Sequence, residues 1–186
     1  MVATMARNLE WDMPKTADQV TQCVVNNIFP VDRWTCVPNA SFGLGFHWEA
    51  DLLALSGSGY LYETEVKVSM QDLKRDRDKR KWSGLIPPSL TPEGVMKGFY
   101  FAMPASLAAR PDAQEIVPYF AGILSCKYLN NGRIQQANVI RRPRINSRAK
   151  KYDDEFRAKM MRLATMRYWK LQGKAAFPTE QQTEGA

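Results

Sequence analysis

Histidine is the scarcest chemically versatile residue in this 186-residue chain, which has His47 as its single instance. One imidazole excludes a histidine-rich metal site and any mechanism that needs two histidines as acid and base. Cysteine is also sparse, since Cys23, Cys36 and Cys126 are odd in number, far apart and set among apolar neighbours. This usage predicts reduced core thiols and argues against a disulfide framework or a metal–thiolate site.

Long apolar runs are missing as well. No stretch approaches the roughly 18 apolar residues of a membrane span, and the first residues lack the apolar core of a secretory signal. We therefore expect a cytoplasmic protein, in a bacterial or phage-infected cell, with no membrane partner. The length and the 45% hydrophobic content predict a single domain over residues 1–172, with a core at about 16–141 and a flexible tail at 173–186.

Charge is distributed unevenly along the chain. Residues 1–126 contain 12 Lys and Arg against 14 Asp and Glu, a balance of −2, whereas residues 127–186 contain 14 against 5, a balance of +9. A basic C-terminal third indicates a polyanionic partner, and nucleic acid is the favoured one because no membrane segment is present.

Hydrophobic periodicity and turn residues predict an alternation of helices and strands. Two hairpins are expected, one around Ser56–Gly59 and one around the Asn-Gly pair at 131–132. The elements predicted in chain order are a helix at 16–29, strands at 33–38, 50–55 and 60–68, a helix at 69–82, a strand at 97–103, a short helix, strands at 121–129 and 133–141, and a helix at 150–172. This order predicts an α/β domain with a mixed β-sheet flanked by helices and a long basic C-terminal helix.

The first hairpin contains the most informative polar residues. The period of two along a strand places Glu63, Glu65 and Lys67 on one face. A turn centred on Ser58 sets Asp51 opposite Glu65 on the adjacent strand, about 5 Å away. Two carboxylates at that spacing repel unless a cation lies between them, and Mg²⁺ suits carboxylate and water oxygens. The alternative is an ordinary strand whose polar face is solvated.

The same stretch resembles a known nuclease family. Asp51, Gly59 and Glu65-Val66-Lys67, followed by Ser69 and Asp72 at the start of a charged helix, resemble the PD-(D/E)xK nuclease superfamily and, within it, the MmcB-like group of DNA-repair and phage-borne proteins. The apolar run at 97–104, which ends at a proline, and the run at 117–124 resemble the strands that follow in that group. The resemblance covers about residues 47–126.

The resemblance implies a restriction-endonuclease-like core that hydrolyses DNA phosphodiesters with Mg²⁺, for which Mn²⁺ can substitute. Asp51 and Glu65 take the positions of metal ligands, and Lys67 the position that assists catalysis. Ala50 stands where the proline of the family name would be, and a further acid from the first helix, Glu10 or Asp18, stays open. Glu49, two residues before Asp51 on the same strand face, and the backbone carbonyl of Val66 are further candidate metal ligands, and we expect supporting roles for Glu63, His47, Ser69 and Asp72.

The basic C-terminal region supplies the expected nucleic-acid contacts: Arg141, Arg142, Arg144, Arg148, Lys150, Lys151 and Arg162. Tyr168 and Trp169, farther along the helix, could stack on unpaired bases or pack against the domain. DNA is the expected partner, with RNA not excluded, and a homodimer would suit the cutting of two strands. Two other functions stay open: an inactive nuclease-fold module that binds nucleic acid, and a structural or regulatory protein with a basic partner-binding tail.

Overall fold

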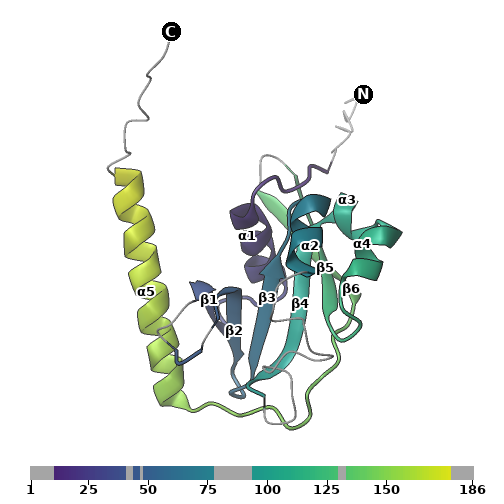
Figure 1. Ribbon diagram of the computed structural model, residues 1–186. Helices are drawn as coiled ribbons and strands as arrows, with labels where there is room; N and C mark the ends of the chain where they lie inside the picture. Colours follow the sequence, from purple (N-terminus) through teal and green to yellow (C-terminus); the bar gives the residue numbers. More distant parts are fainter. Residues whose placement is uncertain (1–10, 41–43, 47, 78–93, 130–132, 177–186) are drawn as a thin grey trace, which may run out of the picture.

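A single six-stranded sheet forms the centre of the computed structural model, which describes residues 11–40, 44–46, 48–77, 94–129 and 133–176, with residues 76–77 and 173–176 described by backbone alone. The strands follow one another across the sheet in chain order, from β1 to β6 (Figure 1). The strands are β1 (Trp34–Ala40), β2 (Ala50–Ser56), β3 (Leu61–Val66), β4 (Met96–Pro104), β5 (Gly122–Leu129) and β6 (Ile134–Arg141). The helices are α1 (Ala17–Asn27), α2 (Met70–Arg77), α3 (Ala105–Ala108), α4 (Pro111–Ile116) and α5 (Asp154–Ala176).

Strand directions make the sheet mixed, as predicted. β1, β2 and β3 are antiparallel neighbours, and so are β5 and β6. β3, β4 and β5 are parallel, because α2 lies in the connection between the first two and α3 and α4 lie in the connection between the last two. The strand predicted at 97–103 is therefore central, and its buried, apolar sequence fits a strand that is covered on both faces.

The first helix begins where its capping residues require. The Thr16 side chain accepts a hydrogen bond from the backbone N–H of Gln19, and the Gln19 side chain accepts one from the N–H of Thr16. This reciprocal pair satisfies two donors that a helix N-terminus otherwise leaves open. Val20, Cys23 and Val24 then form the buried stripe of α1.

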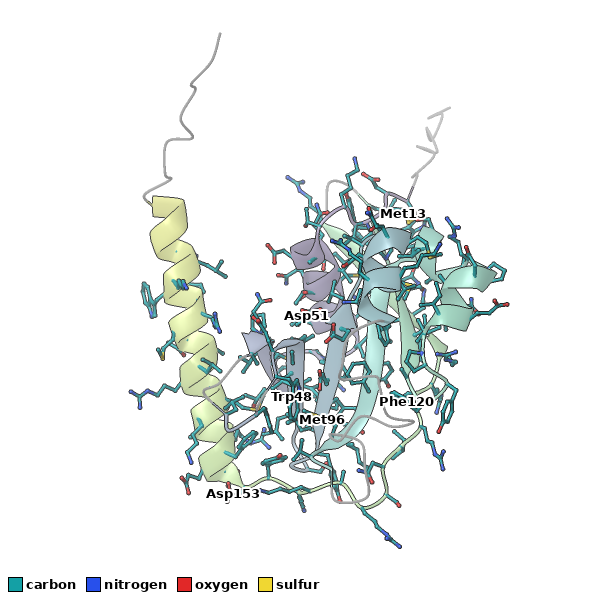
Figure 2. All side chains as sticks on the ribbon, in the orientation of Figure 1. Met13, Trp48, Asp51, Met96, Phe120 and Asp153 are labelled. Atoms are coloured by element: carbon teal, nitrogen blue, oxygen red, sulfur yellow. The ribbon has the colours of Figure 1, made fainter. Side chains whose placement is uncertain are left out.

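The first hairpin has the register that its Gly-Ser turn predicts. Leu52 pairs with Thr64, Leu53 with Glu63, and the ladder continues toward the turn. Gly59 adopts a left-handed backbone with φ of +86°, which glycine tolerates far better than other residues. The Asp51 end of the hairpin and the turn are at opposite ends of the sheet, and Asp153 lies near the turn end (Figure 2).

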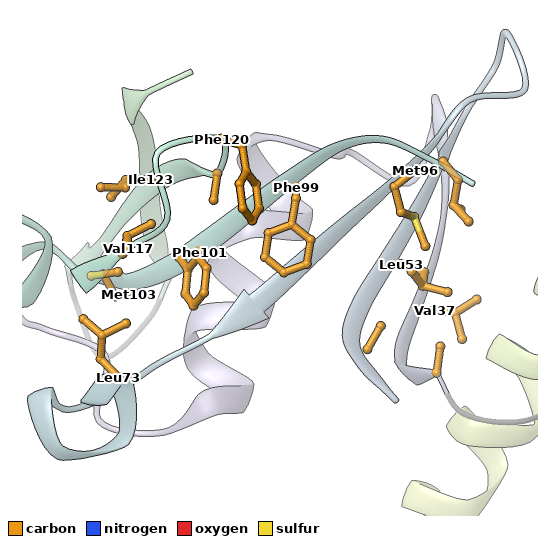
Figure 3. Close-up of a cluster of buried hydrophobic side chains, with 14 of the residues drawn as sticks. Val37, Leu53, Leu73, Met96, Phe99, Phe101, Met103, Val117, Phe120 and Ile123 are labelled. Atoms are coloured by element: carbon orange, nitrogen blue, oxygen red, sulfur yellow. The ribbon is translucent and has the colours of Figure 1, made fainter. Parts of the chain in front are cut away.

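Side chains at alternate positions along the strands pack into two separate hydrophobic cores. On the face covered by α2, α3 and α4, here the α2 face, the buried residues include Leu53, Phe99, Phe101, Met103 and Ile123 (Figure 3). On the face covered by α1, here the α1 face, the strand residues are Leu52, Ala54, Val66, Ala102, Leu124 and Cys126, packed against the α1 stripe. The sheet is thus buried on both sides, and a side chain's face follows from its parity along the strand.

The last helix packs beside the β1 edge of the sheet (Figure 1). Met160 is fully buried, and Phe156 and Leu163 pack on the same core. The Arg157 guanidinium donates hydrogen bonds to Thr35 Oγ1 at 3.1 Å and to the Ser56 carbonyl at 2.8 Å. These bonds attach the first half of α5 to β1 and to the end of β2.

Several predicted boundaries shift in the structure. Residues 150–153, expected to be helical, are extended, because Tyr152 donates its N–H to the Gly59 carbonyl and Lys151 bridges to Tyr60. α5 continues to Ala176, so residues 173–176, expected to belong to the tail, are helical, and residues 177–186 lie outside the described part. Two short helices, α3 and α4, replace the single one expected.

Two further predictions fall on residues that the structure does not describe, namely the end of the helix predicted at 69–82 and the turn at 130–132. Within the described ranges, no helix combines the length and apolarity needed to cross a bilayer.

Candidate active site

The acidic row predicted on the first hairpin lies on the α2 face. Glu63 pairs with Leu53 and Phe99, and Glu65 pairs with Phe101, all of which are on that face. One step beyond the Leu52–Thr64 pair, the ladder sets Asp51 beside Glu65. The register therefore brings two carboxylates to neighbouring positions on adjacent strands, as the turn predicted.

Burial of this row excludes the solvated-strand alternative. Glu63, Glu65 and Lys67 expose 1%, 2% and 3% of their surface. Charged side chains are almost never buried to this extent without partners, because the loss of hydration is expensive. The row is therefore a built polar cluster inside the domain.

The contacts within the cluster satisfy its charges locally. The Lys67 ammonium donates a hydrogen bond to Glu65 Oε2 at 3.0 Å, and the pair is almost fully buried. Asp51 Oδ2 accepts a hydrogen bond from the backbone N–H of Val66 at 2.8 Å. An ammonium and a backbone dipole thus lie where two opposed carboxylates would otherwise repel.

Backbone bonds hold Lys67 in place although it lies just past the end of β3. Its N–H donates to the Ala102 carbonyl at 2.9 Å, which extends the parallel pairing of β3 with β4 by one step. The main chain of Lys67 is thus fixed to β4, and its side chain extends along the α2 face to Glu65 Oε2.

Trp48 belongs to the cluster, although the sequence did not predict it. Its indole Nε1 donates to Glu63 Oε2 at 3.1 Å. Trp48 precedes β2 in a connection without regular structure, so no strand or helix period relates it to Glu63. The available signal was chemical: a buried carboxylate needs a donor, and a tryptophan near a strand start can supply one.

The supporting residues divide into three groups. Ser69 Oγ accepts the N–H of Asp72 at 3.2 Å, so these two residues form the N-terminal cap of α2, as predicted. Glu49 is exposed at the entry to β2. His47 and Glu10 lie outside the described residues.

Asp18 is separated from the acidic row by the sheet. It is in the exposed first turn of α1, whose buried stripe packs on the α1 face, whereas Glu65 is on the α2 face. Across the described residues, no three side chains of the His, Cys, Asp and Glu types are gathered into one possible metal site. Among the described acids, Asp51 and Glu65 are the pair that the ladder places side by side at this row.

The predicted basic surface is largely exposed: Arg142, Arg144, Arg148, Lys150, Lys151 and Arg162 all face solvent. Arg141 differs. Its guanidinium donates to the carbonyls of Ala121, Val117 and Pro118 at 2.8 to 3.0 Å, and burial lowers the pKa of this group. Arg141 thus fastens the connection before β5 to β6, and its charge is occupied there.

The exposed basic residues at 142–151, here the basic segment, run along the turn end of the sheet (Figure 1). Asn146 donates its N–H to the Lys97 carbonyl at the start of β4, and Lys150 donates to Gly94. Glu65 lies beside Phe101, four residues farther along β4. At about 3.3 Å per residue, Glu65 is about 13 Å along the strand from the level of Lys97, where the basic segment crosses β4.

Comparison with known proteins shows the fold and nothing further. No family model matches this chain, and no curated protein matches it. A solved structure described as "SPO1766 protein of unknown function from Silicibacter pomeroyi" matches with a TM-score of 0.53 at 15% sequence identity. The match covers 91% of this chain and 97% of that chain. The two proteins are therefore similar in their mixed α/β architecture over nearly their full lengths.

Proposed function

We propose that this protein is a Mg²⁺-dependent nuclease with a restriction-endonuclease-like core that hydrolyses DNA phosphodiester bonds during repair, recombination or phage DNA processing in the cytoplasm. The observation that carries the proposal is the buried row on the α2 face, where Asp51 and Glu65 occupy neighbouring ladder positions and Lys67 is bonded to Glu65. The sequence around these residues resembles the catalytic motif of PD-(D/E)xK nucleases.

The donor set fits the metal. Mg²⁺ in phosphate-processing sites is bound by one or two carboxylates, with water and substrate oxygens completing its shell. Asp51 and Glu65 supply such a pair, and both are fixed on strands of the central sheet. When bound there, Mg²⁺ would lower the pKa of a coordinated water and offset charge on a phosphate oxygen.

Lys67 supplies positive charge in a site that is screened from bulk solvent. Lys67 exposes 3% of its surface, its main chain is bonded to β4, and its ammonium is bonded to Glu65. A preorganised cation in such a site stabilises the negative charge that develops on an attacked phosphate, and removing one such group typically slows catalysis by about a hundredfold or more. The basic segment would hold the DNA backbone, so binding should weaken steeply with salt.

The test is cleavage of single-stranded, duplex, flapped and branched DNA by the purified full chain with Mg²⁺ or Mn²⁺. We expect cleavage of at least one form, abolished by chelation and by Lys67→Ala, with salt-sensitive binding retained. Asp51→Asn is the second variant, because asparagine keeps the size and an oxygen for the Val66 N–H. Lys74→Ala is the control. Lys74 is exposed on α2, so this variant should cleave DNA at the wild-type rate.

One observation favours a second function, a nuclease-fold module that binds DNA without cutting it. The Glu65–Lys67 pair is satisfied by its own contact, so these residues could serve the core alone. If all four DNA forms stay uncut with either metal while the protein still binds them, the binding module replaces the nuclease. If no DNA is bound at low salt, a structural or regulatory role replaces both.

A further inference from the structure

A pocket of about 480 Å³ lies between the segment that precedes β2 and the start of α5. Four aromatic side chains line it: Phe46 and Trp48 from the first segment, and Tyr152 and Phe156 from the second. Its size is within the range of small-molecule and cofactor sites, and its lining combines aromatic and other apolar side chains with lysines and acids.

The pocket adjoins the acidic row through Trp48. The indole that lines the pocket also donates its N–H to Glu63 at 3.1 Å. Glu63 is one strand period, about 7 Å, from Glu65 on the same face. Figure 2 shows Trp48 below Asp51, on the way from the acidic row to the turn end of the sheet. The Trp48 indole therefore links the wall of the pocket to the buried acidic row.

The opposite side of the pocket is the end of the basic segment. Lys150 and Lys151 line it, and the Lys150 ammonium lies 4.9 Å from the centre of the Tyr152 ring. Two acids are also present, and both have local partners: Asp153 caps α5 through the Phe156 N–H, and Glu155 pairs with Lys159 at 2.7 Å. Lys150, Lys151 and Lys159 outnumber these two acids, so the charged side chains that line the pocket have a net charge of +1.

The aromatic groups are arranged with their rings close together. Phe46 and Trp48 stack with centroids 4.9 Å apart and an interplanar angle of 28°. Tyr152 and Phe156 are 4.0 Å apart, and burial raises the pKa of Tyr152 to about 12, so its phenol stays neutral beside a phosphate. Flat apolar faces next to ammonium groups suit a base and the phosphates on either side of it.

We propose that this pocket receives an unpaired nucleobase of a DNA strand whose phosphates lie along the basic segment. The inference rests on the proposed function and names its substrate class: DNA that is single-stranded or contains unpaired nucleotides, such as a flap or a frayed end. A base within an intact duplex is stacked and paired, and extracting it costs a few kcal/mol, so intact duplex is the poorer ligand.

The test measures binding of the full chain to fluorescein-labelled oligothymidine and to a blunt hairpin duplex, by anisotropy at low salt with chelator present. Wild type should bind the single strand at least about tenfold more tightly than the duplex. Tyr152→Leu keeps apolar volume but removes a stacking face, so it should weaken single-strand binding by about tenfold and leave duplex binding unchanged. Phe156→Leu provides a second pocket variant if Tyr152→Leu unfolds.

Tyr119→Leu is the matched control, because Tyr119 is 62% exposed and does not line the pocket. Tyr168→Leu tests the other exposed tyrosine, at 54%, on the outer half of α5. Equal affinity of wild type for the two DNAs overturns the proposal. A loss confined to Tyr168→Leu also overturns it and moves the stacking site along α5.

The two proposals fail separately. Because chelator is present, single-strand preference through Tyr152 is measured without any cleavage, and it would stand even for a protein that never cuts DNA. Conversely, Lys67-dependent cleavage without that preference supports the nuclease and overturns only the base pocket.

Discussion

The Lys67 ammonium donates a 3.0 Å hydrogen bond to Glu65 Oε2 while the two side chains expose 4% and 3% of their surface. A buried pair of this kind is weak evidence for stability, because the desolvation of both charges offsets their attraction. Removing one partner is strongly destabilising, because the remaining charge is then buried without compensation. The intact pair can therefore add little to the free energy of unfolding, while the removal of one partner is expensive.

Splitting the Glu65–Lys67 pair should destabilise the domain far more than removing it. We expect Lys67→Met to lower the free energy of unfolding by about 3 to 5 kcal/mol, because Glu65 loses the ammonium, and Glu65→Gln to be costly for the converse reason. The double variant should be more stable than the sum of the two losses predicts. Urea denaturation of the four proteins gives the coupling free energy, and simple additivity would contradict a direct interaction.

Gly59, in the hairpin turn, accepts a hydrogen bond from Tyr152 in the segment before α5. A side chain at this position should be poorly tolerated. Its φ is +86°, and a Cβ would collide with the Tyr152 carbonyl. We expect Gly59→Ala to lower the free energy of unfolding by about 2 kcal/mol or more, since the left-handed backbone alone costs about 1 to 2 kcal/mol. Thermal and urea unfolding measure the loss.

Gly57→Ala is the control for this prediction, because it is in the same turn with no atom within 4 Å of the added Cβ. Its unfolding free energy should stay within about 0.5 kcal/mol of wild type. Equal effects at both glycines would mean that the turn, and not the contact with Tyr152, determines the loss.

Local patterns predicted much of the central sheet. The Gly-Ser turn fixed the pairing of Leu53 with Glu63, and Thr16 and Ser69 marked the starts of two helices, because turn and capping chemistry act between residues close in the chain. Parity along β3 also placed Glu63 and Glu65 on one face. These features need no knowledge of what packs above the strand.

Burial of the acidic row and contacts between distant residues could not be predicted from the sequence patterns. The alternation at Glu63, Glu65 and Lys67 looks like that of a solvated strand, and its burial depends on elements that fold over the α2 face. Trp48 and Arg157 likewise reach partners through tertiary packing, with no periodic spacing to reveal them. Residues 150–153 looked helical but pair with the turn instead, since backbone bonds to Gly59 and Tyr60 override weak helix propensity.

Arg157 should matter for the attachment of α5 more than for DNA binding. Its guanidinium donates hydrogen bonds to Thr35 Oγ1 and to the Ser56 carbonyl. Arg157→Met removes both of these charge-assisted bonds. We expect a loss of about 1.5 to 3 kcal/mol in unfolding free energy and faster hydrogen exchange in α5.

Lys159→Met is the comparison for Arg157→Met, because Lys159 makes an exposed pair with Glu155 on the same helix. This variant should change stability and α5 exchange very little. If Arg157→Met leaves exchange in α5 as slow as in wild type, apolar packing by Met160 and Phe156 is sufficient to hold the helix.

Cys36 should resist alkylation in the folded protein across the pH range where free cysteine reacts. Burial raises the pKa of its thiol from 9.0 to about 12, and Sγ donates a hydrogen bond to the Phe29 carbonyl at 3.3 Å. Because the thiolate is the reactive form, iodoacetamide at pH 8 should modify Cys36 about a thousandfold more slowly than it modifies the unfolded chain. Peptide mass spectrometry follows the reaction at Cys36 separately from Cys23 and Cys126.

The pH profile supplies the sharper form of this prediction. In the folded protein the rate at Cys36 should keep rising through pH 9 and 10, about tenfold per unit, whereas the urea-unfolded chain should level off near pH 9. The raised pKa also means that this thiol favours folding below about pH 9 and that its contribution is lost as the pH rises toward 12. A plateau near pH 9 in the folded protein would show that the thiol is hydrated and that Cys36 does not pack as the structure places it.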